Sequence, residues 1–220
     1  MRHSLLFLLL AVFAVGCSSP EGEAVESGDA IPEGGTMTVN NDAGAVYYVD
    51  VDNSSVSWEG AKLAGTHTGE IPVSAGKLMV AGGNLVGGEF QMDINGLTNT
   101  DMPAEEGGDK LVGHLKSADF FDVEKYPFAT FKLLQVQPVT GEEGVTHNLS
   151  GNLTLKGETR SVTLPAKVSV TDDAITATTP KFTIDRNDWG MTYGNSTLGL
   201  AQDKVINDDV GLQVKLMAKK

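Results

Sequence analysis

The chain has 220 residues and a formal net charge of −13, from 16 basic and 29 acidic side chains. This charge repels nucleic acid and anionic lipid head groups, so it excludes nucleic-acid binding and peripheral membrane attachment through a basic patch. A single cysteine also excludes an intrachain disulfide.

The N-terminus has the pattern of a bacterial lipoprotein signal. Met1-Arg2-His3 precedes an apolar run from Leu5 to Val15, which is shorter than the roughly 20 residues that span a bilayer. Small residues then lead to Cys17. We therefore expect residues 1–16 to be a cleaved signal peptide and Cys17 to be lipidated. The alternative is an ordinary secretory signal cleaved nearby, which would leave Cys17 as a free thiol.

Lipidation of Cys17 predicts a protein anchored in the bacterial cell envelope. Several acyl chains on one cysteine suffice for stable membrane attachment. Ser18-Ser19 lacks the aspartate that retains some lipoproteins at the inner membrane, so we expect the outer membrane, with the protein facing the periplasm. Exposure at the cell surface stays open.

Residues 17–45 are predicted to form a disordered acidic tether. They are rich in Gly, Ser, Pro and Glu, and no Lys or Arg occurs between Ser18 and Gly60. With few side chains able to form a core, the entropy of ordering this segment would go uncompensated.

Residues 46–220 are predicted to form one domain, because about 175 residues are ample for one core. Their dominant hydrophobic period is two, most clearly where Val162 to Val170 alternate with polar residues. The expected strands are 46–51, 55–60, 67–73, 76–81, 85–94, 128–138, 148–155, 161–170, 174–185 and 210–217. Gly82-Gly83 predicts a turn, and Gly87-Gly88 predicts a bulge or bend.

One short helix is expected over residues 108–117, where Leu111, Val112 and Leu115 form an apolar side. So many strands with so little helical periodicity favour an antiparallel sandwich or closed barrel. A barrel of about eight strands has an interior just wide enough for its own side chains or for one small ligand.

Motifs for catalysis and metal binding are absent from the sequence. It contains no nucleophile elbow, phosphate loop or dinucleotide fingerprint. His67, His114 and His147 are too dispersed for a metal-binding spacing, and we expect one or both of His67 and His114 to donate structural hydrogen bonds at the barrel mouth. Asp119, Asp122 and Glu124 flank a turn and are expected to be solvated charges or caps. We therefore predict no enzyme activity and no metal or cofactor.

Four motifs occur in a characteristic order: Gly65-Thr-His-Thr-Gly69, the aromatic stretch His114 to Phe131, Gly151-Asn-Leu-Thr-Leu-Lys-Gly157, and Ile184-Asp-Arg-Asn-Asp-Trp-Gly190. Together they make the chain resemble the YceI-like family from about Val46 to Ala218. The resemblance implies an all-β, lipocalin-like closed barrel of about eight strands with one short helix. It also implies a polyisoprenoid, quinone or similar lipid in the lumen, no known catalysis, and a homodimer.

Within such a barrel, several residues are candidates for contact with the ligand, and the phenylalanines among them are open to the alternative of a purely core role. One departure from the family is Trp189, where phenylalanine is usual. Arg186 is open to two interpretations, an internal ion pair at a barrel corner or a contact to the polar end of a lipid. The predicted ligand-binding residues are His67, Phe90, His114, Leu115, Phe120, Phe121, Phe131, Arg186 and Trp189. The alternative function is a structural or stress-response envelope module with a filled barrel that acts through protein contacts.

Overall fold

The computed structural model describes residues 19–32, 44–141, 143–199, 201 and 204–220. The predicted signal peptide 1–16 and the lipidation site Cys17 lie outside the described residues. Within the described ranges, no helix is long and apolar enough to cross a membrane.

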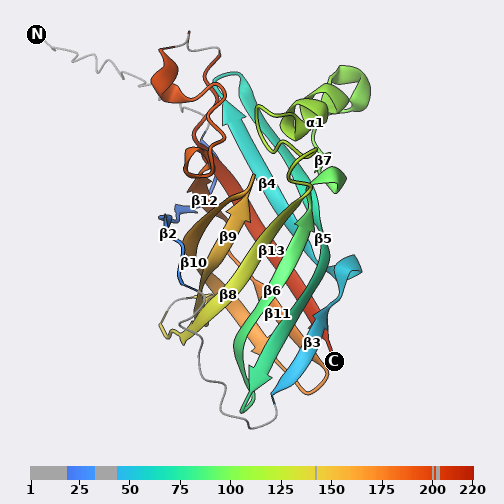
Figure 1. Ribbon diagram of the computed structural model, residues 1–220, viewed down its shortest axis with the longest axis vertical. Coiled ribbons are helices and arrows are strands. Elements are labelled where there is room, and N and C mark those ends of the chain that lie inside the picture. The colour runs from blue at the N-terminus through green and yellow to red at the C-terminus, as the bar shows by residue number, and fades with distance from the viewer. Residues whose placement is uncertain (1–18, 33–43, 142, 200, 202–203) are drawn as a thin grey trace, which may run out of the picture.

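Eight antiparallel strands close into a ring, as predicted (Figure 1). In ring order they are β4 (Ser55–Lys62), β5 (Gly65–Ala81), β6 (Asn84–Asp93), β8 (Phe128–Pro138), β9 (His147–Leu155), β10 (Glu158–Val170), β11 (Ala174–Thr178) and β13 (Asp209–Lys219). β13 pairs with both β11 and β4, which completes the closure.

Shorter strands, one helix and several 3-10 turns surround the eight strands of the ring. They are β1 (Glu23–Ala24), β2 (Gly28–Asp29), β3 (Ala45–Val49), β7 (Thr98–Asn99), β12 (Phe182–Asp185), the helix α1 (Gly108–Lys116), and the 3-10 turns η2 (Val51–Asn53), η3 (Ile94–Gly96), η4 (Ala104–Glu106), η5 (Arg186–Trp189) and η6 (Ser196–Leu198). α1 matches the helix expected at residues 108–117. It stands at one end of the barrel, above β7 in Figure 1.

Two strand predictions differ from the structure. The strands expected at 67–73 and 76–81 are one strand, β5, in which a bulge between Val73 and Ala75 shifts the register instead of ending the pairing. The single strand expected at 174–185 is split into β11 and β12. Pro180 interrupts it because proline has no N–H for the ladder, and the hydroxyl of Thr179 accepts the hydrogen bond from the Val214 amide instead (2.9 Å).

The expectation of a disordered tether is wrong for residues 19–32, which we call the N-terminal strap. β1 pairs in parallel with β12, and β2 pairs antiparallel with β10. The Val25 amide donates to the Thr183 carbonyl (2.8 Å), and the Asn152 side chain bonds to both backbone groups of Ile31 (2.8 and 2.9 Å). The amino-acid composition did not predict the ordered strap. Hydrogen bonds to groups on neighbouring strands hold it in place, and a count of core-forming side chains does not include such bonds.

The barrel interior follows from the period-two pattern. On β10, Val162, Leu164, Ala166 and Val168 are buried and face inward, as the alternation predicted. Tight two-residue turns join neighbouring strands, with positive φ at Gly82 and Gly83 between β5 and β6 and at Lys156 and Gly157 between β9 and β10.

Candidate functional site

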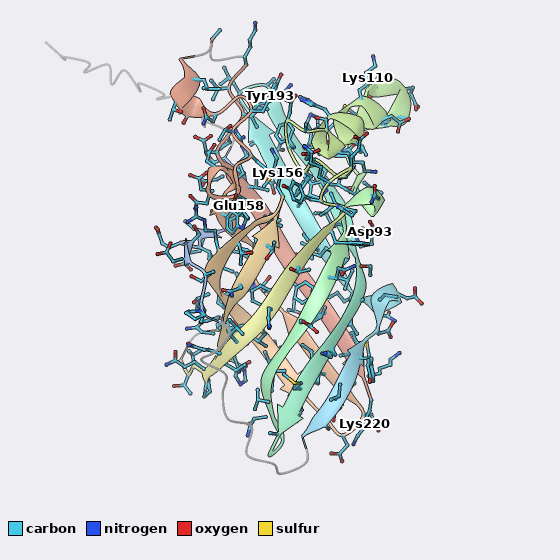
Figure 2. All side chains as sticks on the ribbon, viewed as in Figure 1. Asp93, Lys110, Lys156, Glu158, Tyr193 and Lys220 are labelled. Atoms are coloured by element: carbon cyan, nitrogen blue, oxygen red, sulfur yellow. The ribbon has the colours of Figure 1, made fainter. Side chains whose placement is uncertain are left out.

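An internal cavity of about 450 Å³ occupies the half of the barrel nearest to α1. Lys62 at the end of β4, Glu106 in η4 and Lys110 in α1 line it and are exposed, so the cavity reaches the surface at this end. Figure 2 shows Lys110 and Tyr193 at this end of the barrel and Lys220 near the opposite end. We call this opening the mouth.

The cavity wall is apolar below the mouth. Its main side chains are Val56, Trp58, Ile71, Phe90, Met92, Ile94, Leu97, Leu111, Leu115, Phe120, Phe131, Leu153, Leu155, Leu164, Phe182, Ile184, Leu212 and Val214. Leu212 and Val214 face this space and stay only half-buried within a closed barrel. The volume falls in the range of small-molecule sites, about 300–1,000 Å³. The lumen is therefore open at this end rather than filled by its own side chains.

Each of the two histidines at the mouth contacts an aspartate. His67 Nδ1 lies 3.0 Å from Asp101 Oδ2, and His114 Nε2 lies 2.9 Å from Asp119 Oδ2. The His114 ring also packs edge-on against Phe120 and Tyr193, with centroids 5.1 and 4.8 Å apart. These contacts agree with the structural hydrogen bonds expected of the histidines. No group of three or more potential metal ligands occurs among the described residues.

The carboxyl of Asp101 is held ionised at the mouth. Partial burial alone would raise its pKa, but hydrogen bonds from the Thr68 amide (2.8 Å), from His67 and from Asn99 (2.6 Å) outweigh burial and lower the pKa. Because Asp101 follows β7 and Thr68 lies on β5, this carboxylate fastens the loop before α1 to the rim of the barrel.

Arg186 is a buried residue at the edge of the cavity. Its side chain is 3 % exposed, and its guanidinium donates to the carbonyls of Asn207 (3.0 Å), Ile206 (3.2 Å) and Met191 and to Asp208 Oδ1 (3.3 Å). The planar fork thus ties η5 to the segment that leads into β13. The ion pair expected at this corner exists, although its acid is Asp208 rather than a carboxylate next to Arg186 in sequence.

The pKa values of this pair follow from their surroundings. Burial lowers the pKa of Arg186, and the charges of Asp208 and Asp185 oppose that effect. For Asp208, burial would raise the pKa, but hydrogen bonds from Ser196 and Asn187 and the Arg186 charge outweigh it, so the pKa lies below its usual value.

Most of the predicted ligand-binding residues lie around one space. The residues that line the cavity are His67, Phe90, His114, Leu115, Phe120, Phe121, Phe131 and Arg186. Trp189 is the exception: it is fully buried outside the cavity lining, and its indole N–H donates to the Leu153 carbonyl (3.0 Å). From the sequence, the position of Trp189 after a polar turn did not indicate whether its side chain would face the cavity or pack outside the cavity lining. Ligand contact by the other eight stays a prediction.

Several cavity residues were missed from the sequence. Trp58 and Val56 carried a signal, because alternation along β4 places them on the same face as Gly60. Ile206 and Asn207 carried none, since they lie in an irregular segment that Arg186 brings to the mouth.

The glycine at position 69 of the first motif has a specific steric cause. A Cβ at Gly69 would lie 1.9 Å from the Thr98 carbonyl oxygen and 2.6 Å from the Trp58 ring, so only glycine lets the indole cross β5 and donate to Thr98 (3.1 Å).

Lys156, in the turn after β9, donates through Nζ to the Ala118 carbonyl (3.0 Å) and thereby ties this turn to the corner after α1.

Fold and cavity together define a lipocalin-like barrel with an apolar internal site open at one end. The YceI-like domain family matches residues 47–218, and the chain belongs to this family. Proteins named YceI from Salmonella arizonae and Salmonella newport are 47 % identical over 55 residues, which is 25 % of this chain and 27 % of theirs. The matched stretch thus spans about a quarter of these relatives.

Two solved structures share the fold. BcnA of Burkholderia cenocepacia superposes with a TM-score of 0.60 at 21 % identity, over 78 % of this chain and 99 % of that one. A polyisoprenoid-binding domain from Saccharophagus degradans superposes with a TM-score of 0.57 at 19 % identity, over 79 % of this chain and 97 % of that one. The N-terminal strap lies before residue 47, where the family match begins.

Proposed function

We propose that this protein binds a long apolar chain, such as a polyisoprenoid or the tail of a quinone, in the barrel cavity. The observation that carries the proposal is the apolar cavity of about 450 Å³ that opens at a polar mouth. The fold shared with a polyisoprenoid-binding domain supports it. The protein is a carrier or sequestering protein in this proposal, and not an enzyme.

The energetics of such a complex are favourable. At about 30 Å³ per methylene, close to the volume of a water molecule in the liquid, the cavity holds about 15 methylenes. Burying them contributes about 12 kcal/mol at roughly 0.8 kcal/mol each. Association costs of about 4 kcal/mol leave about 8 kcal/mol, which corresponds to a Kd of about 1 μM.

The proposal includes attachment to the bacterial envelope through a lipid on Cys17. The lipoprotein-like sequence before Cys17 supports this part. Metabolic labelling with a fatty acid tests it, with Cys17→Ser as the matched control that cannot be acylated. Label on the wild-type chain alone is the expected result, and an unlabelled wild-type chain would refute the anchor.

Native mass spectrometry with solvent extraction tests ligand binding. The mature chain from residue 17, carrying Cys17→Ser and made in a bacterial host without the signal peptide, avoids the detergent that a lipidated protein requires. We expect a stoichiometric long-chain lipid in the extract. A protein that arrives empty and takes up no added quinone or prenyl alcohol would refute the carrier function and favour a structural module.

A blocked cavity provides the control. Gly60 lines the cavity, and a Cβ there would meet only the Trp58 ring edge at 3.9 Å, so Gly60→Phe is expected to fold while its ring occupies the space below the mouth. It should lose the lipid. Ser57→Phe, on the opposite face of the same strand, should keep it.

A further inference from the structure

The lumen is divided into two chambers of very different size. Below the cavity of about 450 Å³ lies a second, apolar space of about 40 Å³. Four side chains line both spaces and therefore form the partition between them: Phe90, Phe131, Leu164 and Val214.

The two phenylalanines are the bulk of this partition. Phe90 on β6 and Phe131 on β8 are direct cross-strand neighbours, and their ring centroids lie 5.7 Å apart at an interplanar angle of 45°. Both side chains are buried, so each ring projects into the lumen rather than toward solvent. A contact of this kind stabilises a pair of rings beyond their burial alone.

The neighbouring strand is shaped to receive one of the rings. A Cβ at Gly151 on β9 would lie 2.7 Å from Phe131 Cζ, so the missing side chain leaves the space that this ring fills. The ring is thus confined by the wall and is not free to swing aside into the next strand.

Below the partition the lumen is packed shut. Leu78, Leu85, Leu133, Leu149 and Leu216 line the small chamber and are all buried. A chain that enters from the mouth therefore meets the rings of Phe90 and Phe131 at the end of its path, with room for about one methylene beyond them.

We propose that Phe90 and Phe131 form the floor of the binding site and set the length of chain that it accepts. This inference rests on the proposed function. The apolar tail points toward the floor and the polar end stays at the mouth. About 15 carbons, or three isoprene units, fit above the floor, and the rest of a longer chain remains outside the mouth.

Binding of a homologous series of n-alkanols, each below its solubility limit, tests the floor. Alkanols are uncharged, so the net charge of −13 does not bias the series. Trp58 lines the upper chamber, and its fluorescence gives a readout that calorimetry can confirm. In the wild-type protein we expect Kd to fall about fourfold per added methylene up to about 15 carbons and then to level off.

Removal of the floor should move this break. In Phe131→Ala, the vacated ring and the small chamber admit more chain, and we expect the break at a length about four carbons or more greater. Phe131→Leu should give a smaller shift and provides a milder test if the alanine variant does not fold. Leu149→Ala is the matched control: it enlarges only the lower chamber, with the floor intact, and should leave the break in place.

The outcomes separate the two proposals. A folded wild-type protein that binds no alkanol of any length, and no prenyl alcohol, would overturn the proposed function and this inference with it. Binding without a break, or a break that stays in place in both Phe131 variants, would overturn the floor alone and leave the carrier function standing.

Discussion

Replacement of Arg186 by methionine is expected to destabilise the barrel by about 3–5 kcal/mol. The guanidinium donates to three carbonyls and to Asp208, and methionine fills a similar volume without any donor. Each buried carbonyl left without a partner costs about 1–3 kcal/mol. Ile206 and Asn207 are half-buried and Asp208 is partly exposed, which keeps the total near the cost of breaking a buried ion pair, about 3–5 kcal/mol.

Urea denaturation followed by circular dichroism measures this loss. With a slope of about 2 kcal/mol per molar urea, the midpoint should fall by about 2 M, and Tm by about 10 °C. Arg160→Met is the matched control. Its side chain is 39 % exposed and bonds to a single carbonyl (3.2 Å), so less than about 1 kcal/mol should be lost.

The same variant separates the two interpretations of Arg186. If the residue is structural, the folded Arg186→Met protein should bind an apolar chain with a Kd within about threefold of the wild-type value. A loss of stability below about 1 kcal/mol, or a large loss of binding in a fully stable variant, would refute the structural argument.

Two further predictions concern a glycine and the acid limb of stability. Gly69→Ala should destabilise the protein by about 3 kcal/mol or more in urea denaturation, because the new Cβ would lie 1.9 Å from a backbone oxygen. Gly113→Ala is the control: its Cβ has open space around it, and it should stabilise α1 by up to about 1 kcal/mol. Equal effects of the two substitutions would contradict the steric argument. The lowered pKa of Asp101 and Asp208 means that both contribute stability above their unfolded pKa, about 3.9, and lose it as pH falls below that value. Asp101→Asn should flatten the fall in urea midpoint below about pH 4, and an unchanged pH profile would show that Asp101 is not responsible.

The sequence predicted the features that repeat along the chain. Period-two alternation located the strands, and the apolar side of residues 108–117 located α1, because both depend on local spacing. The glycine motifs indicated sites of close approach, although Trp58 as the partner of Gly69 required the register between β4 and β5.

Features that depend on distant segments were out of reach. Whether the lumen is open depends on how residues from several strands share its cross-section, and Phe131 reaches its place only because Gly151 stands opposite. Trp189 was assigned to the lumen, yet its indole is aimed at the Leu153 carbonyl, a group that no local pattern marks. The strap was missed for a similar reason, since its partners on β12 and β10 lie more than a hundred residues away.

The strap also changes how far a lipid anchor would let the barrel travel. A flexible segment from Cys17 to residue 45 could extend about 100 Å, at about 3.5 Å per residue. Pro20 is buried, and its Cβ lies 3.1 Å from the position that a Cβ at Gly211 would occupy. Only about three residues, or about 10 Å of extended chain, therefore separate Cys17 from the barrel wall. A lipidated form on so short a tether could not carry a chain across the envelope, and would have to load and deliver its cargo at the surface of a single membrane.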